Sequence, residues 1–557
     1  MRHPVRLFLA LLLLASGTGC APTTNPPLPA PWFEDVTDTA GIDFEHVRGL
    51  ETRYWFPEIM SGGAAWLDYD DDGFFDLYLV QGGDLAAPPA ARPGNRLYRN
   101  HGDGTFTDVT ASSLTGDTGY GMGAATGDYD GDGDTDLYVT NVGPNVLYRN
   151  NGDGTFTDVA RMAGVDHPGW GTSAAFFDYD GDGDLDLFVV NYILWSPERE
   201  ITCFSGGHAR DYCLPDNYHA PAPDVLYRNN GDGTFTDVAR AAGIATARGN
   251  GLGVAPADYD GDGDLDLYVA NDGDPNHLWI NQGDGTFRER ALVAGAAFNR
   301  QGMAEAGMGV TPVDLDDDGD LDLFLTHLRE ETNTVYLNHG GLFEDVTLRT
   351  GLAVPSLPYT GFGTAFADFD LDGQLDLYVT NGRVSLAHTP LADDPYAEPD
   401  QLFRGLGGGR FEEVLPPGGT AEPLLGAGRA LAVADYDNDG DPDLLVVNNG
   451  GPARLLRNRI GDGGRWIAFR LLDRHGRTPT GALVGLEAGG RWRWRLAGTA
   501  YGYQAAHDPR VFFGLGADTS LTRLDVVWPG GGRETFPPPS PGAFHMLREG
   551  SGRPVPR

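Results

Sequence analysis

Short runs of β-branched and aromatic residues recur along the chain, separated by turns rich in Gly and Asp. The run 137–141, Leu-Tyr-Val-Thr-Asn, is typical of a buried β-strand. A second pattern follows it, in which Leu-Tyr-Arg-Asn, a Gly-Asp-Gly turn and Phe-Thr-Asp-Val predict a hairpin at 147–159. This hairpin recurs at 97–109, 226–238 and 278–288, and in degenerate form at 336–346 and 403–414. The self-similarity predicts a repeated unit of four short strands.

A four-stranded sheet repeated radially is the blade of a β-propeller, so residues 33–458 predict a seven-bladed propeller. Paired small residues such as Gly121 and Gly123 occur at a fixed distance before each turn, and they predict that backbones approach closely there. The seventh unit has a third strand at 454–458 but no Phe-x-x-Val strand after it. The missing strand stands at 33–37, and we expect it to complete blade seven and close the ring.

A nine-residue loop, Asp-x-Asp-x-Asp-Gly-x-x-Asp, precedes the second strand of every unit. Carboxylates at positions 1, 3, 5 and 9 and a backbone carbonyl at position 7 form the all-oxygen shell that calcium prefers, so the chain predicts about seven Ca²⁺ ions, one per blade. The glycine at position 6 permits the sharp turn that aims both halves of the loop at one ion. The expected ligands are Asp68, Asp70, Asp72, Phe74 and Asp76; Asp128, Asp130, Asp132, Asp134 and Asp136; Asp178, Asp180, Asp182, Asp184 and Asp186; Asp258, Asp260, Asp262, Asp264 and Asp266; Asp314, Asp316, Asp318, Asp320 and Asp322; Asp368, Asp370, Asp372, Gln374 and Asp376; and Asp435, Asp437, Asp439, Asp441 and Asp443.

Three other interpretations of these loops fit the sequence less well. An EF-hand needs a Glu at position 12 and a following helix, whereas position 12 is always Leu or Val here, as at Val139. A dinucleotide-binding turn needs a helix directly after its glycines, and Gly121-x-Gly123 leads into an acidic loop instead. Solvated acidic turns could explain a single copy of the loop, but they explain seven copies in register poorly. Carboxylates crowded together without a cation cannot all stay ionised.

The charge of the chain limits its partners. The 557 residues carry a net charge of −41, and all the Lys+Arg positions are arginine. Nucleic acid and a bare anionic membrane are therefore poor partners. The segment 459–557 is the exception, with 14 Arg against 8 Asp and Glu. We hypothesise that this basic segment docks on the acidic ring.

The first 20 residues have the features of an export signal, with two arginines, an apolar run at 7–15 and small residues before Cys20. Gly17-Thr-Gly-Cys20 resembles a bacterial lipoprotein processing site, although Gly17 stands where that motif usually has Leu. We expect a lipid anchor at Cys20, followed by a Pro-rich tether at 21–32. The protein would then be an outer-membrane or cell-surface lipoprotein that meets the membrane only through that anchor; plain cleavage would make it periplasmic or secreted.

Cys203 and Cys213 lie in the longest gap between two acidic loops. In an exported protein, two cysteines this close favour a disulfide over a metal pair, since no matching His or Cys set accompanies them. The bridge would hold an insertion of blade three at 191–224. This insertion either carries binding function or decorates the blade, and the sequence leaves both possibilities open.

The periodicity changes after 459. Strand-like runs such as 466–471, 492–496 and 524–528, separated by Gly-rich turns, predict a small β-sandwich-like domain at 459–540, with 541–557 as a tail. The fold class expected for the whole chain is therefore all-β.

Two family resemblances support this organisation. The acidic loops with their second hairpins resemble FG-GAP/VCBS repeats, which also form the propeller of integrin α chains. The C-terminal segment is similar to the ASPIC/UnbV domain through Gly481-Ala482, 498–504, Phe513-Gly-Leu-Gly516 and Val526-Val-Trp-Pro-Gly530, although 477–480 departs from the expected Asn-rich turn. The order of the two regions resembles bacterial relatives of the cartilage acidic protein group, whose paired cysteines also look like those found here. The resemblance implies an extracellular calcium-binding protein without an assigned reaction.

Two functions from different classes are compatible with the sequence. The first is an exported, integrin-like binding or cell-adhesion module that holds a protein or glycan ligand on a loop face of the propeller, with calcium stabilising the blades. The second is an extracytoplasmic hydrolase or natural-product tailoring enzyme. The 13 histidines occupy no fixed place in the repeat, so no catalytic set can be assigned from spacing. His507-Asp508 is the best single candidate, against the simpler interpretation of an exposed turn.

Overall fold

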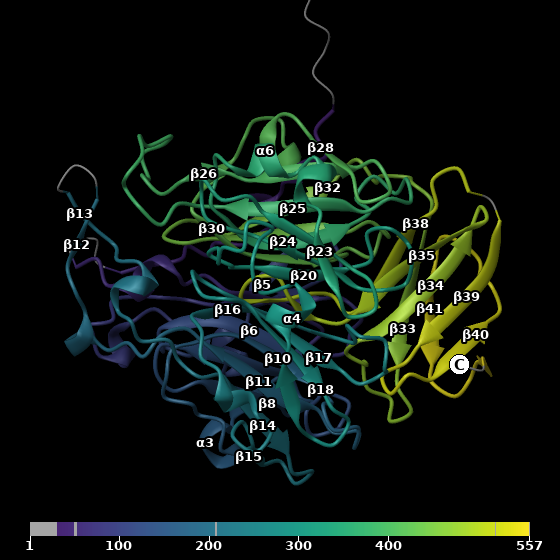
Figure 1. Cartoon of the computed structure of the whole chain (residues 1–557), viewed down its shortest axis with the longest axis horizontal. Helices are drawn as coiled ribbons and strands as arrows, with labels where there is room; N and C mark the ends of the chain where they lie inside the picture. The colour runs from purple at the N-terminus through teal and green to yellow at the C-terminus, as the bar shows by residue number, and fades with distance from the viewer. Residues whose placement is uncertain (1–29, 50–52, 206–208, 519, 556–557) are drawn as a thin grey trace, which may run out of the picture. The chain divides into compact units, whose positions relative to one another are not determined.

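The computed structural model describes residues 30–49, 53–205, 209–518 and 520–555, and within them nearly all regular structure is β (Figure 1). Pro31–Arg557 form one compact unit. The propeller predicted from the sequence is confirmed. In the described residues its strands form seven antiparallel sheets, named blades one to seven in the order of their acidic loops.

Each blade runs from an inner strand, which contacts the neighbouring blades, to an outer strand. Blades one to three contain β2 (Ala64–Leu67), β3 (Asp76–Leu79), β4 (Arg96–Asn100) and β5 (Phe106–Asp108); β6 (Gly121–Gly127), β7 (Asp136–Asn141), β8 (Val146–Asn150) and β9 (Phe156–Asp158); and β10 (Gly171–Phe177), β11 (Asp186–Asn191), β14 (Val225–Asn229) and β15 (Phe235–Asp237). Blades four and five contain β16 (Gly251–Ala257), β17 (Asp266–Asn271), β18 (His277–Asn281) and β19 (Phe287–Glu289); and β20 (Val310–Val313), β21 (Asp322–Leu325), β22 (Thr334–Asn338) and β23 (Phe343–Asp345). Blades six and seven contain β24 (Gly361–Ala367), β25 (Asp376–Asn381), β27 (Gln401–Gly405) and β28 (Phe411–Glu413); and β30 (Gly428–Ala434), β31 (Asp443–Asn448), β32 (Arg454–Asn458) and β1 (Phe33–Asp35).

The seven inner strands contact one another in cyclic order, and β30 of blade seven contacts β2 of blade one. The N-terminal strand closes this ring as expected. Phe33 pairs with Asn458, and Asp35 pairs with Leu456, so β1 supplies the outer strand of blade seven. Phe33 is buried and meets Phe369 of blade six edge-on, with ring centroids 5.2 Å apart. The closing strand therefore holds two blades together as well as completing one.

The paired small residues lie where inner strands meet, as the sequence suggested. A Cβ atom on Gly123 would lie 2.5 Å from the Thr172 carbonyl of the next blade, and one on Gly253 would lie 2.5 Å from the Met308 carbonyl. Such distances exclude a side chain unless a backbone moves.

A hairpin from the C-terminal region runs between these inner strands. It consists of β36 (Ala500–Tyr501) and β37 (Ala505–Ala506), and β37 pairs in parallel with β2. At its tip, Gly502 exchanges backbone hydrogen bonds with Val310 of blade five, and the amide of Gln504 donates to the Ser173 hydroxyl of blade three (3.1 Å). We call residues 500–506 the plug, because they contact inner strands from several blades.

The C-terminal domain is a sandwich of two sheets around an apolar core, as expected. Its sheets are formed by β38 (Val511–Gly514), β33 (Trp466–Leu472) and β41 (Phe544–Arg548), and by β35 (Arg491–Ala497), β34 (Ala482–Ala488), β39 (Leu521–Val527), β40 (Arg533–Phe536) and β42 (Arg553–Pro554). The boundary expected at 540 is too early. The segment 541–557, taken from the sequence as a tail, supplies β41 and β42, because each of them pairs with a strand of this domain.

The remaining elements are short. The α-helices are α1 (Thr37–Ala40), α2 (Thr110–Ser113), α3 (Ala160–Ala163), α4 (Ala291–Ala294), α5 (Thr347–Thr350) and α6 (Ala353–Ser356). The 3-10 turns are η1 (Phe56–Ile59), η2 (Pro89–Ala91), η3 (Pro197–Arg199), η4 (Pro215–Asn217), η5 (Ile244–Thr246) and η6 (Pro417–Gly419). In the described residues, two small two-stranded sheets lie outside the blades: β12 (Cys203–Phe204) with β13 (Arg210–Asp211), and β26 (Glu398–Pro399) with β29 (Leu425–Gly426).

Candidate metal centres

Each acidic loop, called a cage from here on, folds back on its first aspartate. In cage two, the amide of Gly133 donates to Asp128 Oδ2 (3.1 Å); the equivalent bond in cage four joins Gly263 to Asp258 (2.9 Å). The position-6 glycines have φ between +86° and +102° in all seven cages. This left-handed conformation is the reason for glycine there, since other residues adopt it only with strain.

The position-9 aspartate ties the cage to the third strand of its blade. In blade two, Asp136 Oδ1 accepts from the amide of Asn150 (2.8 Å) and Oδ2 accepts from the amide of Tyr129 (3.0 Å). The same pair of bonds recurs in the other blades at Asp76, Asp186, Asp266, Asp322, Asp376 and Asp443. Burial raises the pKa of Asp136 to about 9 and that of Asp76 to about 8. The sequence assigned these residues only as ligands; they also hold each cage to its sheet.

The structure brings positions 1, 3 and 9 together. Their carboxylate oxygens lie within 4.8 Å of one another in Asp68–Asp70–Asp76, Asp128–Asp130–Asp136, Asp178–Asp180–Asp186 and Asp314–Asp316–Asp322. In cage four the group of this kind is Asp258, Asp260 and Asp262. The position-5 carboxylate is partly engaged elsewhere, since Asp132 Oδ1 accepts from the amide of Asp134 (3.0 Å), and Asp318 accepts from Asp320 (2.9 Å). The residue at loop position 7 thus donates its backbone N–H to the position-5 carboxylate of the same loop.

The residues fit a divalent cation. Several buried cage oxygens have no hydrogen-bond partner among the described residues, namely Asp70 Oδ1, Asp368 Oδ1, Asp437 Oδ1 and Asp441 Oδ1. An unpaired buried carboxylate oxygen is costly, and a hard cation removes that cost. The aspartate clusters of this chain could therefore hold metal ions.

Arginines neutralise part of the cage charge. Arg99 on β4 pairs with Asp70 (2.7 Å) and Asp72 (3.2 Å), and blades six and seven repeat this contact through Arg404 and Arg457. Each of these three arginines stands immediately before the last residue of the third strand of its blade. This fixed position in the repeat explains why the contact recurs.

Further arginines reach the cages from the C-terminal domain. Arg477 donates to the Gly183 carbonyl and pairs with Asp184 of cage three (3.2 Å). Arg510 donates to the Asp435 carbonyl of cage seven (2.7 Å) and to Asn438 Oδ1 (2.6 Å). For half-buried Arg495, loss of solvent lowers the pKa, and the nearby charges of Asp368, Asp317 and Asp314 oppose this by raising it. The docking of the basic segment on the acidic ring was a hypothesis from charge alone; charge did not reveal which arginines make it.

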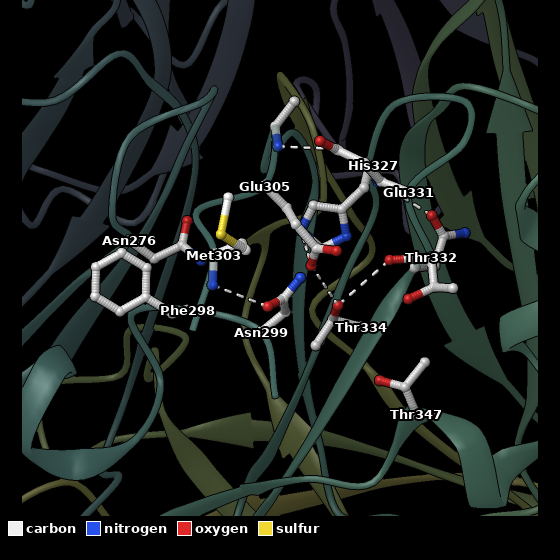
Figure 2. A network of polar contacts seen from close by, with 12 residues as sticks. Asn276, Phe298, Asn299, Met303, Glu305, His327, Glu331, Thr332, Thr334 and Thr347 are labelled. Carbon is white, nitrogen blue, oxygen red and sulfur yellow. Dashed lines mark hydrogen bonds and ion pairs between the residues drawn. The ribbon is translucent and has the colours of Figure 1, made fainter. Parts of the chain in front are cut away.

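A polar network that the sequence did not indicate lies on blade five (Figure 2). Buried His327 has Nε2 at 3.8 Å from Glu305 Oε2, and the Thr334 hydroxyl donates to the same oxygen (3.0 Å). Glu331 Oε2 accepts from the amide of Ala306 (3.0 Å), and burial raises the pKa of Glu331. The other repeats do not have His and Glu at the positions equivalent to His327 and Glu331. The repeat pattern therefore could not predict this network.

The insertion of blade three packs onto an aromatic cluster. Cys203 and Cys213 form a disulfide. Tyr218 stacks on Phe56 with centroids 5.3 Å apart, and Trp195 lies edge-on to Trp170 (6.1 Å). The insertion also leaves four apolar side chains at least 38 % exposed, which are Leu194, Ile201, Phe204 and Leu214.

His507 and Asp508 are not an exposed turn. His507 is fully buried, its Nδ1 accepts from the amide of Val433 (3.1 Å), and its ring stacks on Tyr501 at 3.7 Å. Burial lowers the pKa of His507 to about 3. Asp508 is paired with Arg510 (2.6 Å). Both residues hold the plug and the cage-seven contact in place.

The N-terminal expectations fall outside the described residues, since Cys20 and the export signal lie before residue 30. Within the described residues, none of the helices has the length and apolar content needed to cross a bilayer.

The sequence of the chain matches the models of two protein families. Segments at 68–139, 128–189, 212–269, 258–325, 314–379 and 391–473 match the FG-GAP-like repeat, and together they cover more than half of the chain. The chain belongs to the FG-GAP-like repeat family. Its C-terminal segment, 473–554, matches ASPIC and UnbV, which places β41 and β42 inside that domain.

This FG-GAP protein is similar to cartilage acidic protein 1. It is 28 % identical to the human protein over 330 residues, which are 57 % of this chain and 46 % of the relative. It is 30 % identical to the Mus musculus protein over 278 residues, which are 48 % of this chain and 40 % of the relative. The match thus spans less than half the length of each relative.

Solved structures resemble the FG-GAP protein more distantly. A lectin from Agrocybe aegerita, described with non-reducing terminal N-acetylglucosamine, has a TM-score of 0.36 at 18 % identity and covers 66 % of this chain and 83 % of its own. The Photorhabdus luminescens Tc holotoxin pore has a TM-score of 0.31 at 14 % identity and covers 71 % of this chain and 17 % of its own.

Proposed function

We propose that this protein is an exported binding or adhesion module whose seven cages each hold a Ca²⁺ ion. The observation that carries the calcium part is the set of converging carboxylates with buried, unpartnered oxygens in loops of one repeated design. Hard oxygen donors with no nitrogen or sulfur ligand favour Ca²⁺ over zinc or copper.

The expected role of the ions is structural. Every cage sits between the first two strands of a blade, so an occupied cage fixes the hairpin that forms the inner half of the sheet. Extracellular modules bind calcium with Kd on the order of 10⁻⁴ to 10⁻³ M. At tenfold excess over Kd, each site would add about 1.4 kcal/mol, and seven independent sites about 10 kcal/mol.

Calcium removal tests this role. We expect the melting temperature to fall sharply in excess EGTA and to return when calcium is added back, while magnesium at the same concentration restores less. Equilibrium dialysis against buffer that contains calcium at about tenfold the Kd should give about seven bound calcium ions per chain, as the number of cages requires. Overlapping melting curves with and without EGTA would refute the structural role.

For the ligand, we propose a protein or glycan bound at the blade-three insertion. Support comes from the exposed side chains Phe204 (63 %) and Leu214 (46 %), which lie on a segment held by a disulfide and an aromatic cluster. A preorganised apolar surface of this kind is typical of an interaction site. A pull-down from the envelope fraction with Phe204→Asp should lose the partner that the wild type retains. The matched control is Leu292→Asp on α4, where Leu292 is 67 % exposed away from the insertion; equal loss in both variants would contradict the assignment.

For the location, we propose a lipid anchor at Cys20. Replacement by Ser should move the protein from the membrane fraction to the soluble fraction of the envelope, and an unchanged distribution would contradict the anchor. The Gly-Thr-Gly-Cys motif is the support for this proposal.

A further inference from the structure

A cavity of about 460 Å³ lies between the C-terminal domain and the cages of blades one and two. Its walls include Trp66 and Phe75 of blade one, Thr126 of blade two, and Arg470, Phe544 and Thr499 of the C-terminal region. Small-molecule sites commonly occupy 300–1,000 Å³ at such junctions, as a rough range, and combine apolar walls with a few polar groups.

One wall of the cavity is a rigid stack. The Arg510 guanidinium lies over the rings of Phe75 and Phe544, 4.7 Å from each centroid. Its N–H groups are engaged by Asp508 and Asn438, so the arginine is fixed and cannot swing into the cavity. The stack therefore presents flat apolar surface to an occupant without needing to move.

One cation of the cavity has no partner for its side chain. Arg470 lies on β33 and is exposed, and its guanidinium makes no hydrogen bond or ion pair among the described residues. A guanidinium without a partner matches a ligand that brings acceptor oxygens.

The acidic groups of the cavity are turned toward their own loops. Asp68 Oδ2 accepts from the amide of Gly73 (3.1 Å), and Asp128 Oδ1 accepts from the amide of Gly131 (2.8 Å). Of the arginines that line the cavity, Arg477 pairs with Asp184 and Arg510 pairs with Asp508. Arg470 is therefore the lining cation whose side chain has no carboxylate partner among the described residues.

We propose that this cavity binds a small amphipathic organic anion, with an aromatic body on the Phe75–Arg510–Phe544 wall and a carboxylate or sulfonate paired with Arg470. The site is separate from the ligand surface proposed at the blade-three insertion, and it does not depend on that surface.

Two probes with the same aromatic body test the charge requirement. 1-Anilinonaphthalene-8-sulfonate carries the anion, and N-phenyl-1-naphthylamine lacks it. Fluorescence titration in calcium-containing buffer should give one saturable sulfonate site per chain, with the neutral probe bound roughly tenfold more weakly. Equal affinity for the two probes would overturn the proposed anion preference.

Two variants locate the site. Arg470→Glu should weaken sulfonate binding by roughly tenfold or more and leave the neutral probe within about twofold. Thr478→Trp should fill the cavity and abolish saturable binding of both, because Thr478 also lines it. Arg553→Glu is the matched control, since Arg553 is exposed on β42 and does not line the cavity. Unchanged binding in Arg470→Glu or Thr478→Trp would overturn the assignment.

Folding and calcium controls keep this test separate from the proposed calcium role. All three variants should retain the wild-type response of the melting temperature to EGTA. A protein without any calcium response could still bind the sulfonate probe through Arg470, and a calcium-stabilised protein without probe binding would refute the cavity proposal alone.

Discussion

At the scale of single residues, the position-9 aspartate has two roles that sequence spacing could not separate. Asp136 is an expected ligand, yet both its oxygens already accept backbone N–H groups from Asn150 and Tyr129. The spacing revealed the carboxylate because the motif repeats. It could not reveal the amides, because their approach depends on the third strand folding back beside the loop.

Asp136→Asn should therefore destabilise the blade even without calcium. The amide NH₂ would face a backbone N–H, and we expect a loss of about 1–3 kcal/mol in the free energy of unfolding. Denaturant titration in EGTA measures this loss. The control is Asp38→Asn, because Asp38 is exposed on α1 and its carboxylate makes no hydrogen bond among the described residues; it should change stability by less than about 0.5 kcal/mol. Equal stability of Asp136→Asn and the wild type in EGTA would show that the carboxylate acts only through a metal.

The pH dependence of the stability of the calcium-free protein is also set by single residues. Burial raises the pKa of Asp68 to about 6, of Asp314 to about 7 and of Asp136 to about 9, above the ordinary value of 3.8. A folded-state pKa above the unfolded value gives stability that is lost as pH rises through the folded value. In EGTA, the melting temperature should thus fall as the pH rises from the ordinary pKa of 3.8 to about 9, with the contribution of Asp68 lost by about pH 6 and that of Asp136 by about pH 9. With calcium bound the carboxylates stay ionised, so the fall should be smaller; identical pH profiles would contradict this account.

At the scale of elements, the blades were predictable because one pattern is repeated seven times. The closing strand at 33–37 was predictable for a similar reason, since a missing strand in the last unit matched an extra one at the start. The strands at 544–548 and 553–554 were missed. They pair with β33 and β40 of a domain that occurs once, so no second copy revealed their pattern.

Phe33→Ala tests the closing strand. Phe33 is 1 % exposed and packs on Phe369 and Tyr378, so its truncation should cost about 3–5 kcal/mol of unfolding free energy. Glu34→Ala is the control, because Glu34 lies on the same strand with its side chain exposed. Calorimetry of both variants gives the comparison. A loss no larger than that of Glu34→Ala would show that β1 does not carry the closure.

At the scale of the whole molecule, the contact between the two domains is more than electrostatic. Arg477 and Arg510 fulfil the charge argument made from the sequence. The plug adds buried contacts between the two domains that the distribution of charge could not predict. Tyr503 is fully buried, donates to the Met60 carbonyl (2.8 Å) and packs edge-on against Phe362 (4.9 Å). A hairpin of two-residue strands that occurs once gives no periodic signal, so its place among the inner strands could not be predicted from the sequence.

Salt should therefore leave the domains together. At about 0.5 M NaCl, where surface ion pairs are largely screened, we expect the radius of gyration from small-angle scattering to match that at low salt. The control is Tyr503→Ala, which removes the buried tip of the plug and should make the dimensions sensitive to salt. Expansion of the wild type at this salt concentration would show that ion pairs alone hold the C-terminal domain.

The strand β1 and the plug both pair with strands of the ring, although they are far apart in the sequence, and this has a consequence for biosynthesis. Phe33 cannot pair with Asn458 until residue 458 has been synthesised, and Ala64 cannot pair with Ala505 until residue 505 has been synthesised. A nascent chain leaving the ribosome from its N-terminus thus keeps the strand β1 unpaired until the last fifth of translation, and the β2 edge unpaired until the last tenth. Contacts this distant in sequence form slowly, and open edges invite aggregation. Premature termination anywhere in the C-terminal domain should consequently harm solubility far more than the loss of so few residues suggests.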